Sequence, residues 1–321
     1  MRSAPAILCA IFVTACATTA PRPVPNVIAR YAAAGPHAIA SGDAEWRDTT
    51  RNVVVRARIY YPIDAGPHPL IVFSHGLGNS RFGYRYLGEH WASWGLISVH
   101  IEHPGAGQDI ARRGWLALYR AGFDRRLWTS TPADVHFILD RLLSADAPPF
   151  LASRIDRGDV GVAGHSLGAY VALATAGAIV RLPDANAALP RDSRIRAAAA
   201  LSMSENLPPS AYGGTDVPIL HLTGTSDSSL FYATTKRIRR IPFESITGAP
   251  QLLATIAGAN HSTFSADDRA PRAERTDLIK GLTLLWWQAW LQNDRAARTM
   301  LFDPAFAAGL TSFATIETKN R

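Results

Sequence analysis

Strand-like and helix-like segments alternate along most of the chain. Residues 52–61 alternate β-branched with polar side chains, which predicts a half-buried strand in an antiparallel pair. Short continuous apolar runs follow, as expected of strands that are buried on both faces of a parallel sheet. These runs are Leu70–Phe73, Leu96–Ile101, Val160–Ala163, Ile195–Leu201, Ile219–Leu222 and Leu252–Ile256.

Helices are predicted between these strands from the spacing of apolar residues. One runs from Tyr84 to Trp94 and is stopped by Gly95. A second is predicted to begin at Thr131, with Thr131 as its cap and Pro132 in its first turn. The others are predicted at Leu167–Val180 and, as the final helix, Thr276–Leu291, with core positions at Trp286, Trp287 and Trp290.

This alternation predicts an α/β fold, with a mostly parallel central sheet and helices on both faces. One catalytic domain, residues 41–321, accounts for the pattern. Residues 106–130, called the cap below, interrupt it as an insertion rich in aromatic and aliphatic side chains. Such a segment can form an apolar cover over an acyl group, with Trp115 and Trp128 as substrate-binding candidates, or can simply pack onto the sheet.

The first residues resemble an export signal. Arg2 supplies a positive charge, and Ala6–Ala15 is apolar but too short to span a bilayer. Val13-Thr14-Ala15-Cys16 resembles a bacterial lipobox, whose cysteine receives lipid. We expect residues 1–15 to be removed, Cys16 to carry the lipid and residues 16–40 to act as a tether. The alternative is an ordinary secretory signal cleaved at Ala15 or Ala17.

The lipobox interpretation predicts export from a bacterial cytoplasm and a membrane-anchored protein that faces the periplasm or the cell surface. The other cysteine, Cys9, lies in the segment expected to be removed, so no disulfide is expected. The net charge is +7, from 33 basic and 26 acidic residues spread along the chain, so nucleic-acid binding is not expected. The densest basic run, residues 236–240, is interpreted as a solvated face, with contact to an anionic lipid or substrate as the alternative.

The strongest chemical signal is Gly164-His165-Ser166-Leu167-Gly168, between a predicted strand and a predicted helix. This is the G-x-S-x-G pattern, in which a sharp turn lifts the serine hydroxyl above the sheet. A serine alcohol is a weak nucleophile and needs a base within hydrogen-bond reach. His261, directly after the last predicted strand, is the candidate base. The sequence therefore predicts Ser166 as nucleophile and His261 as general base.

The remaining parts of the predicted site are a carboxylate and two oxyanion donors. Asp227 follows a strand and lies between serine and histidine in the chain, in the order Ser, acid, His; Glu205 is the rival. The backbone N–H groups of Leu77 and Leu167 are the candidate oxyanion donors. His75, beside Leu77, is interpreted as a structural hydrogen-bonding residue. Metal ligation by His100, Glu102 and His103 is not expected, because alternation along a strand points His100 and Glu102 to one face and His103 elsewhere.

Three segments carry a resemblance to a known family: Pro69–Gly78, Trp91–Leu96 and Ile101–Gly105. Together they resemble the platelet-activating-factor acetylhydrolase and dienelactone-hydrolase-like branch of the α/β-hydrolases, over about residues 46–290. The resemblance implies a serine hydrolase of carboxylic esters, acting on a small-molecule or lipid ester, with no metal and no organic cofactor. A thioesterase or amidase, or a non-catalytic surface lipoprotein on the same scaffold, are the alternatives, and the oligomeric state is open.

Two features depart from that branch. Dienelactone hydrolases use a cysteine nucleophile, whereas this chain has Ser166. Platelet-activating-factor acetylhydrolases place the acid after the earlier strand, where this chain has Ser202 to Glu205 and no aspartate. The second departure moves the expected acid to Asp227.

Overall fold

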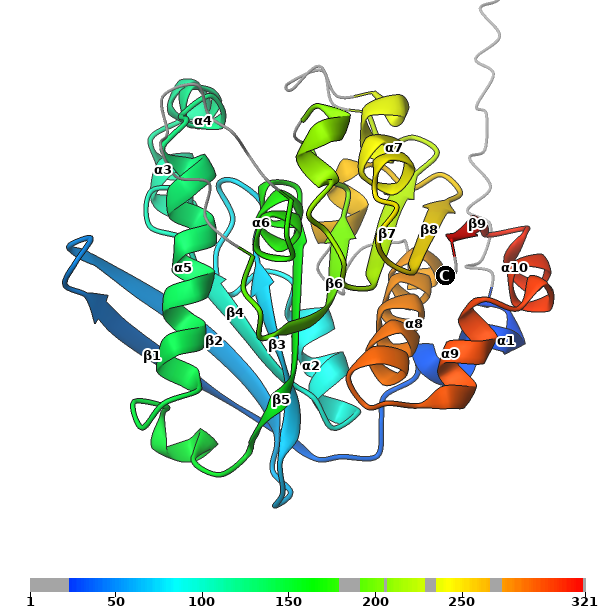
Figure 1. The fold of residues 1–321 in the computed structure, drawn as a ribbon, viewed down its shortest axis with the longest axis horizontal. Coiled ribbons are helices and arrows are strands. Elements are labelled where there is room, and N and C mark those ends of the chain that lie inside the picture. The colour runs from blue at the N-terminus through cyan, green and yellow to red at the C-terminus, as the bar shows by residue number, and fades with distance from the viewer. Residues whose placement is uncertain (1–22, 179–190, 205–206, 229–234, 266–272, 320–321) are drawn as a thin grey trace, which may run out of the picture.

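The computed structural model describes residues 23–178, 191–204, 207–228, 235–265 and 273–319. In this part of the chain, nine strands form one sheet in the order β1-β2-β4-β3-β5-β6-β7-β8-β9 (Figure 1). The strands from β4 to β8 in that order are parallel, and β1, β2 and β9 pair antiparallel at the two edges. Their bounds are β1 Ile39–Asp48, β2 Val53–Pro62, β3 His68–Ser74, β4 Ile97–Glu102, β5 Ile155–His165, β6 Ile195–Leu201, β7 Ile219–Gly224, β8 Gln251–Ile256 and β9 Ala314–Lys319.

Helices cover both faces of the sheet. On one face α5 and α6 pack over the central strands, and on the other face lie α1, α2, α8, α9 and α10 (Figure 1). The α-helices of the described residues are α1 Asn26–Ala32, α2 Arg85–Ser93, α3 Gln108–Arg112, α4 Trp115–Gly122, α5 Leu127–Leu142, α6 Leu167–Thr175, α7 Lys236–Ser245, α8 Ala273–Trp290, α9 Arg295–Leu301 and α10 Pro304–Leu310. Short 3₁₀ turns lie at Pro149–Leu151, Pro209–Tyr212 and His261–Ser265. No helix in the described ranges combines the length and the apolar character needed to cross a membrane.

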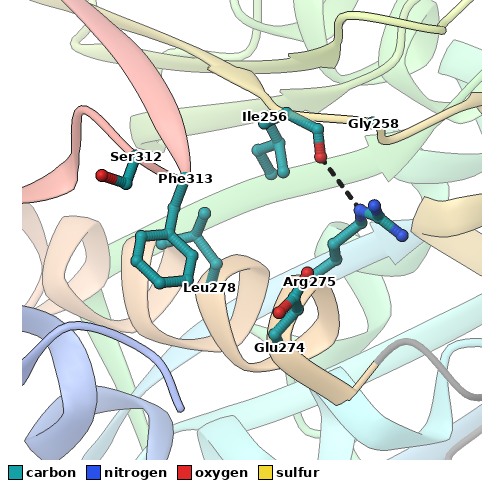
Figure 2. A pocket seen from close by; sticks show the side chains of 8 residues that line it. Ile256, Gly258, Glu274, Arg275, Leu278, Ser312 and Phe313 are labelled. Atoms are coloured by element: carbon teal, nitrogen blue, oxygen red, sulfur yellow. Dashed lines mark hydrogen bonds between the residues drawn. The ribbon is translucent and has the colours of Figure 1, made fainter. Parts of the chain in front are cut away.

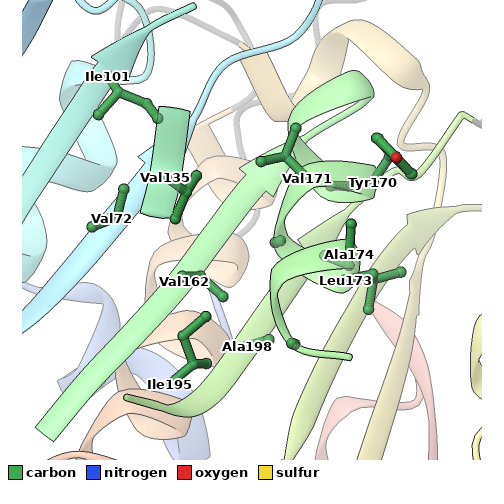
Figure 3. Packing of buried hydrophobic residues seen from close by; sticks show 14 of the residues in the cluster. Val72, Ile101, Val135, Val162, Tyr170, Val171, Leu173, Ala174, Ile195 and Ala198 are labelled. Carbon is green, nitrogen blue, oxygen red and sulfur yellow. The ribbon is translucent and has the colours of Figure 1, made fainter. Parts of the chain in front are cut away.

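The apolar runs of the central strands are continuous because each strand supplies both cores. In β3, Leu70 and Val72 join the core under α5 and α6, whereas Ile71 and Phe73 join the opposite core. Successive side chains on a strand point to opposite faces, so a strand covered on both sides needs apolar residues at every position. Figure 3 shows the first of these cores, with Val162 of β5 between side chains of α5 and α6.

The predicted α/β fold, with its mostly parallel sheet and helices on both faces, is therefore confirmed. The predicted strands are present in every case, with bounds that differ by a few residues. The predicted first pair is also present, since β1 and β2 form a long antiparallel ladder.

The predicted start of the helix at Thr131 is wrong, because α5 already begins at Leu127. The Thr131 hydroxyl does not cap the helix but donates to the carbonyl of Leu127 one turn earlier, at 2.6 Å. Pro132 lies inside the helix and has no N–H for the carbonyl of Trp128. The hydroxyl of Tyr170 in α6 donates to that carbonyl instead, so a tertiary contact satisfies the group that the proline leaves open.

Two further differences concern the ends of the chain. The helix at Thr276–Leu291 is present as α8, but α9, α10 and β9 follow it, and β9 extends the sheet beside β8. Residues 26–32, assigned above to the tether, form α1, in which Ile28 is fully buried against Gly281 of α8.

The helix predicted at Leu167–Val180 ends at Thr175, and Val180 lies outside the described residues. Cys16 and Glu205 also lie outside them.

Candidate active site

Ser166 sits in a sharp turn between β5 and α6. Its backbone has φ 57° and ψ −118°, a conformation that non-glycine residues rarely adopt. Residues held in such sparsely populated conformations cluster at active sites, where the surrounding structure maintains the strain. The side chain is largely buried but reaches a pocket at the carboxyl ends of the parallel strands.

The two glycines of the motif are needed because backbone segments meet around the turn. A Cβ atom on Gly164 would lie 2.1 Å from the carbonyl oxygen of Gly168. A Cβ atom on Gly168 would lie 1.9 Å from the carbonyl oxygen of Ser74, at the end of β3. Both contacts are with backbone, which cannot move aside as a flexible side chain can. The motif therefore fixes the position of α6 against β3 as well as the shape of the turn.

The structure brings His261 to Ser166 across 95 residues of sequence. His261 begins the short turn after β8, and its Nε2 atom lies 3.0 Å from Ser166 Oγ. The Ser204 hydroxyl lies 3.3 Å from the same Oγ atom. The distance between Nε2 and Oγ is a hydrogen-bond distance, which is the geometry a general base needs to take the hydroxyl proton.

Asp227 lies on the other side of the imidazole, after β7. The carboxylate is fully buried, and Oδ2 accepts a hydrogen bond from the hydroxyl of Thr223 at 2.9 Å. Oδ1 lies 3.5 Å from His261 Nδ1. The carboxylate therefore stands beside the ring nitrogen that faces away from Ser166, at a distance longer than a direct hydrogen bond.

Sequence reasoning missed Arg239, which lies in α7 within the run interpreted as a solvated face. The interpretation is wrong for this residue, whose side chain is fully buried. Its Nη2 atom lies 2.9 Å from Asp227 Oδ1 and 3.2 Å from His261 Nδ1. Nη1 donates to the carbonyls of Ser202 and Met203, and Nε donates to the carbonyl of Asp227. The available signal was helical spacing, since Arg239 and the buried Phe243 are four residues apart on one helix face.

Sequence reasoning also gave no role to Ser202, at the end of β6. Its Oγ atom lies 2.6 Å from His261 Nδ1, closer than Asp227 or Arg239. Ser202 has a positive φ of 51°, so the backbone turns sharply to present this hydroxyl. The closest contact of Nδ1 thus comes from the end of β6 through Ser202, whereas the carboxylate of Asp227, after β7, lies farther from it.

A chain of buried hydrogen bonds connects the base to the loop after β3. The amide of Gly76 donates to the Tyr84 hydroxyl, which donates to His165 Nδ1 at 2.7 Å. His165 Nε2 then donates to the carbonyl of His261 at 3.1 Å. Burial, together with the neighbouring His261 and Arg239, holds the pKa of His165 well below its ordinary value, so the ring is neutral. These two hydrogen bonds require a neutral imidazole at His165, because Nδ1 accepts and Nε2 donates.

The predicted oxyanion donors lie at the same pocket. Leu77 and Leu167 both line it beside Ser166. Among the described residues, no carbonyl or side chain accepts a hydrogen bond from the backbone N–H of either leucine. His75 is buried, and its Nδ1 donates to the carbonyl of Gly76 at 2.8 Å, while Nε2 accepts from the amide of His103. Burial lowers the pKa of His75 to about 3, so it acts as a neutral support of this loop.

The two substrate-binding candidates lie in different places. Trp128 lines the pocket that contains Ser166, and the hydroxyl of Tyr170 bonds its carbonyl. Trp115 does not line this pocket and is 72% exposed on α4. The cap therefore has an inner side that meets the pocket and an outer side that does not.

A second hollow lies beyond the end of β8, away from Ser166. Figure 2 shows its lining, in which Arg275 of α8 donates to the carbonyl of Ala257 at 2.9 Å. The next residue, Gly258, has φ +64° and donates its amide to the Thr225 hydroxyl. Through these contacts the loop that carries His261 is held to α8 and to the loop after β7. None of the proposed catalytic residues lines this hollow.

Comparison with known proteins supports the α/β fold described above. The family model described as platelet-activating factor acetylhydrolase, isoform II, matches residues 48–109. The match covers β2, β3, α2 and β4, including Leu77, and stops before Ser166, Asp227 and His261. The search of curated proteins found no match.

Fold, match and turn geometry together define the class of protein. The chain has the α/β-hydrolase fold, and over the matched segment it is similar to the platelet-activating factor acetylhydrolases. This similarity supports a hydrolase that acts on esters.

Proposed function

We propose that the protein is a serine hydrolase of carboxylic esters that works through an acyl-enzyme intermediate. The observation that carries the proposal is the 3.0 Å distance between Ser166 Oγ and His261 Nε2, at a serine with strained backbone. Ser166 attacks the ester carbonyl while His261 takes the hydroxyl proton. The alcohol leaves with that proton. His261 then takes a proton from a water molecule, which attacks the acyl carbon, and returns it to Ser166 Oγ as the bond to the serine breaks and the carboxylic acid leaves.

In this mechanism Asp227 stabilises the imidazolium that forms when His261 accepts a proton. The buried cation of Arg239, 3.2 Å from Nδ1, has the opposite effect, because two like charges repel strongly where water is excluded. The carboxylate of Asp227 offsets that cation. Ser202 Oγ, at 2.6 Å, is the nearest atom to which an Nδ1–H can donate, and this contact fixes the ring orientation.

The amides of Leu77 and Leu167 complete the proposed site as donors to the oxyanion. Loss of one such donor typically costs about 3 kcal/mol of transition-state stabilisation in serine hydrolases. The inner side of the cap, with Trp128, forms the apolar wall beside the acyl group.

A fluorophosphonate probe tests the nucleophile directly, because the oxygen of an activated serine displaces its fluoride and becomes phosphonylated, whereas an ordinary serine does not react. Wild-type protein is expected to be labelled and to hydrolyse p-nitrophenyl esters, and Ser166→Ala is expected to lose both properties. Ser204→Ala is the matched control, since its hydroxyl lies only 3.3 Å from that of Ser166. Labelling that survives in Ser166→Ala contradicts the proposal. If the folded wild-type protein is not labelled at all, the result favours a non-catalytic scaffold. Parallel assays with thioesters and amides of the same acyl group distinguish the alternative leaving groups.

We also propose that the mature chain begins at Cys16 and is held at a membrane by lipid on this residue. The support is the sequence Val13-Thr14-Ala15-Cys16 after a short apolar run. Growth with labelled palmitate is expected to label the wild type and not the Cys16→Ala variant. Release of unlabelled wild-type protein into the soluble fraction would favour ordinary secretion instead.

A further inference from the structure

The eight-residue helix α4 and the residue directly after it expose four large apolar side chains. Trp115 is 72% exposed and Phe123, at the helix end, is 60% exposed, with Leu116 and Tyr119 exposed by 44% and 41%. No residue of α3 or α4 is buried. Apolar side chains grouped on one surface in this way are typical of an interaction site, because leaving them in water costs free energy.

The inner side of the same helix accounts for its contact with the protein. Leu118 packs so closely on Gly78 that a Cβ atom there would lie 2.7 Å from it. Ala121 and Gly122 line the pocket that contains Ser166. The helix is thus anchored by its inner residues, and its outer aromatic residues are not used by the core or by the pocket.

Positive charge predominates around the exposed apolar residues. The cap holds five arginines and two aspartates, all arginines are exposed, and both acids lie within reach of one of them. The arginines are Arg112, Arg113, Arg120, Arg125 and Arg126. At the same end of the sheet, α7 begins with the exposed Lys236 and Arg237 (Figure 1). Aromatic and aliphatic side chains with arginines beside them characterise helices that lie in the interface of an anionic bilayer.

We propose that the outer side of the cap docks this end of the molecule onto an anionic lipid surface. Trp115, Leu116 and Phe123 enter the boundary between headgroups and acyl chains, and the arginines contact the phosphates. The Ser166 pocket, on the inner side of the same helix, then opens beside the lipid. The docking does not depend on the ester hydrolysis proposed above, because binding is measured without turnover.

Vesicle sedimentation of the full chain tests the proposal, with Cys16→Ala in every sample so that no attached lipid contributes. The unmodified cap is expected to bind phosphatidylcholine vesicles that contain phosphatidylglycerol, and to bind less as salt is raised. Trp115→Ala/Phe123→Ala is expected to weaken this binding at least about tenfold, since burial of each large apolar side chain is worth about that factor. Arg112→Glu/Arg113→Glu is expected to remove the preference for phosphatidylglycerol over pure phosphatidylcholine.

Two controls make the result specific. Ile63→Ala removes an apolar side chain that is 50% exposed outside the cap, and it is expected to bind like the parent. Ser166→Ala is also expected to bind like the parent, so that failure of the catalytic proposal leaves this one intact. Thermal unfolding of each variant shows that the fold is unchanged.

Unchanged vesicle binding in the Trp115→Ala/Phe123→Ala variant overturns the proposal. A second result would also overturn it: the parent is a dimer in gel filtration, the variant is a monomer, and vesicle binding is the same in both. The exposed apolar side chains of the cap would then contact a second copy of the chain.

Discussion

The buried guanidinium of Arg239, beside the proposed triad, leads us to predict a large effect of its removal on the free energy of unfolding. Replacing Arg239 by methionine keeps most of the side-chain volume and removes the charge. The carboxylate of Asp227 then stays fully buried without its 2.9 Å partner, and the carbonyls of Ser202 and Met203 lose their charged donor. Removing one partner of a buried ion pair typically costs 3–5 kcal/mol, since an uncompensated charge remains in a low dielectric. We expect Arg239→Met to lower the free energy of unfolding by about 4 kcal/mol, or Tm by roughly 10 °C.

The neighbouring Arg240 supplies a matched control in the same helix. Its guanidinium pairs with Glu317 and Glu244, but the side chain is one-third exposed. Partly exposed pairs of this kind contribute about 0–1 kcal/mol, because water solvates the charges once a partner is lost. Arg240→Met is therefore expected to change the free energy of unfolding by no more than about 1 kcal/mol.

A double-mutant cycle in urea tests the cause of the loss. Asp227→Asn neutralises the carboxylate, so Arg239→Met in that background leaves no buried negative charge. The double variant is expected to be more stable than the sum of the single effects by about 2–3 kcal/mol. Additive effects, or a cost for Arg239→Met as small as that for Arg240→Met, would refute the reasoning.

Three further predictions concern the acid, its neighbour and the response to pH. Asp227→Asn is expected to reduce kcat for ester substrates about 10⁴-fold, as in other triads, and Glu205→Gln is expected to have little effect on kcat. A larger loss of kcat in Glu205→Gln than in Asp227→Asn would instead assign the acid to Glu205, in the loop after β6. Ser202→Ala is expected to lower kcat about tenfold at unchanged KM, and Ser202→Thr to recover part of the loss, because ring orientation and not binding is disturbed; a change in KM alone would contradict this role. Burial lowers the pKa of His221 to about 4, below its ordinary value of 6.5. Its contribution to stability is therefore complete above pH 6.5 and falls as the pH drops towards 4, since only the unfolded chain binds the proton in that window. Urea unfolding of His221→Asn is expected to lose about 3 kcal/mol of this pH dependence, and an unchanged slope would argue against it.

The sequence by itself determined the parallel strands and the turn at Ser166. Every residue of a strand such as Leu70–Phe73 must be apolar when helices cover both faces, so the pattern carries the architecture. The turn requires glycine at positions 164 and 168, because a Cβ atom there would lie less than 2.2 Å from a backbone carbonyl oxygen. This requirement makes the turn recognisable from Gly164 and Gly168 in the sequence. His261 could be predicted because the carboxyl ends of parallel strands meet at one edge of the sheet.

Tertiary structure decided the features that depend on a partner from a distant segment. Thr131 and Pro132 have the pattern of a helix start, but Tyr170 satisfies the carbonyl of Trp128 and lets α5 begin earlier. Arg239 is part of a basic run and is buried because Asp227 and three carbonyl groups compensate its charge. Local sequence records which side chains can form such contacts, whereas only the folded chain brings their partners within 3 Å.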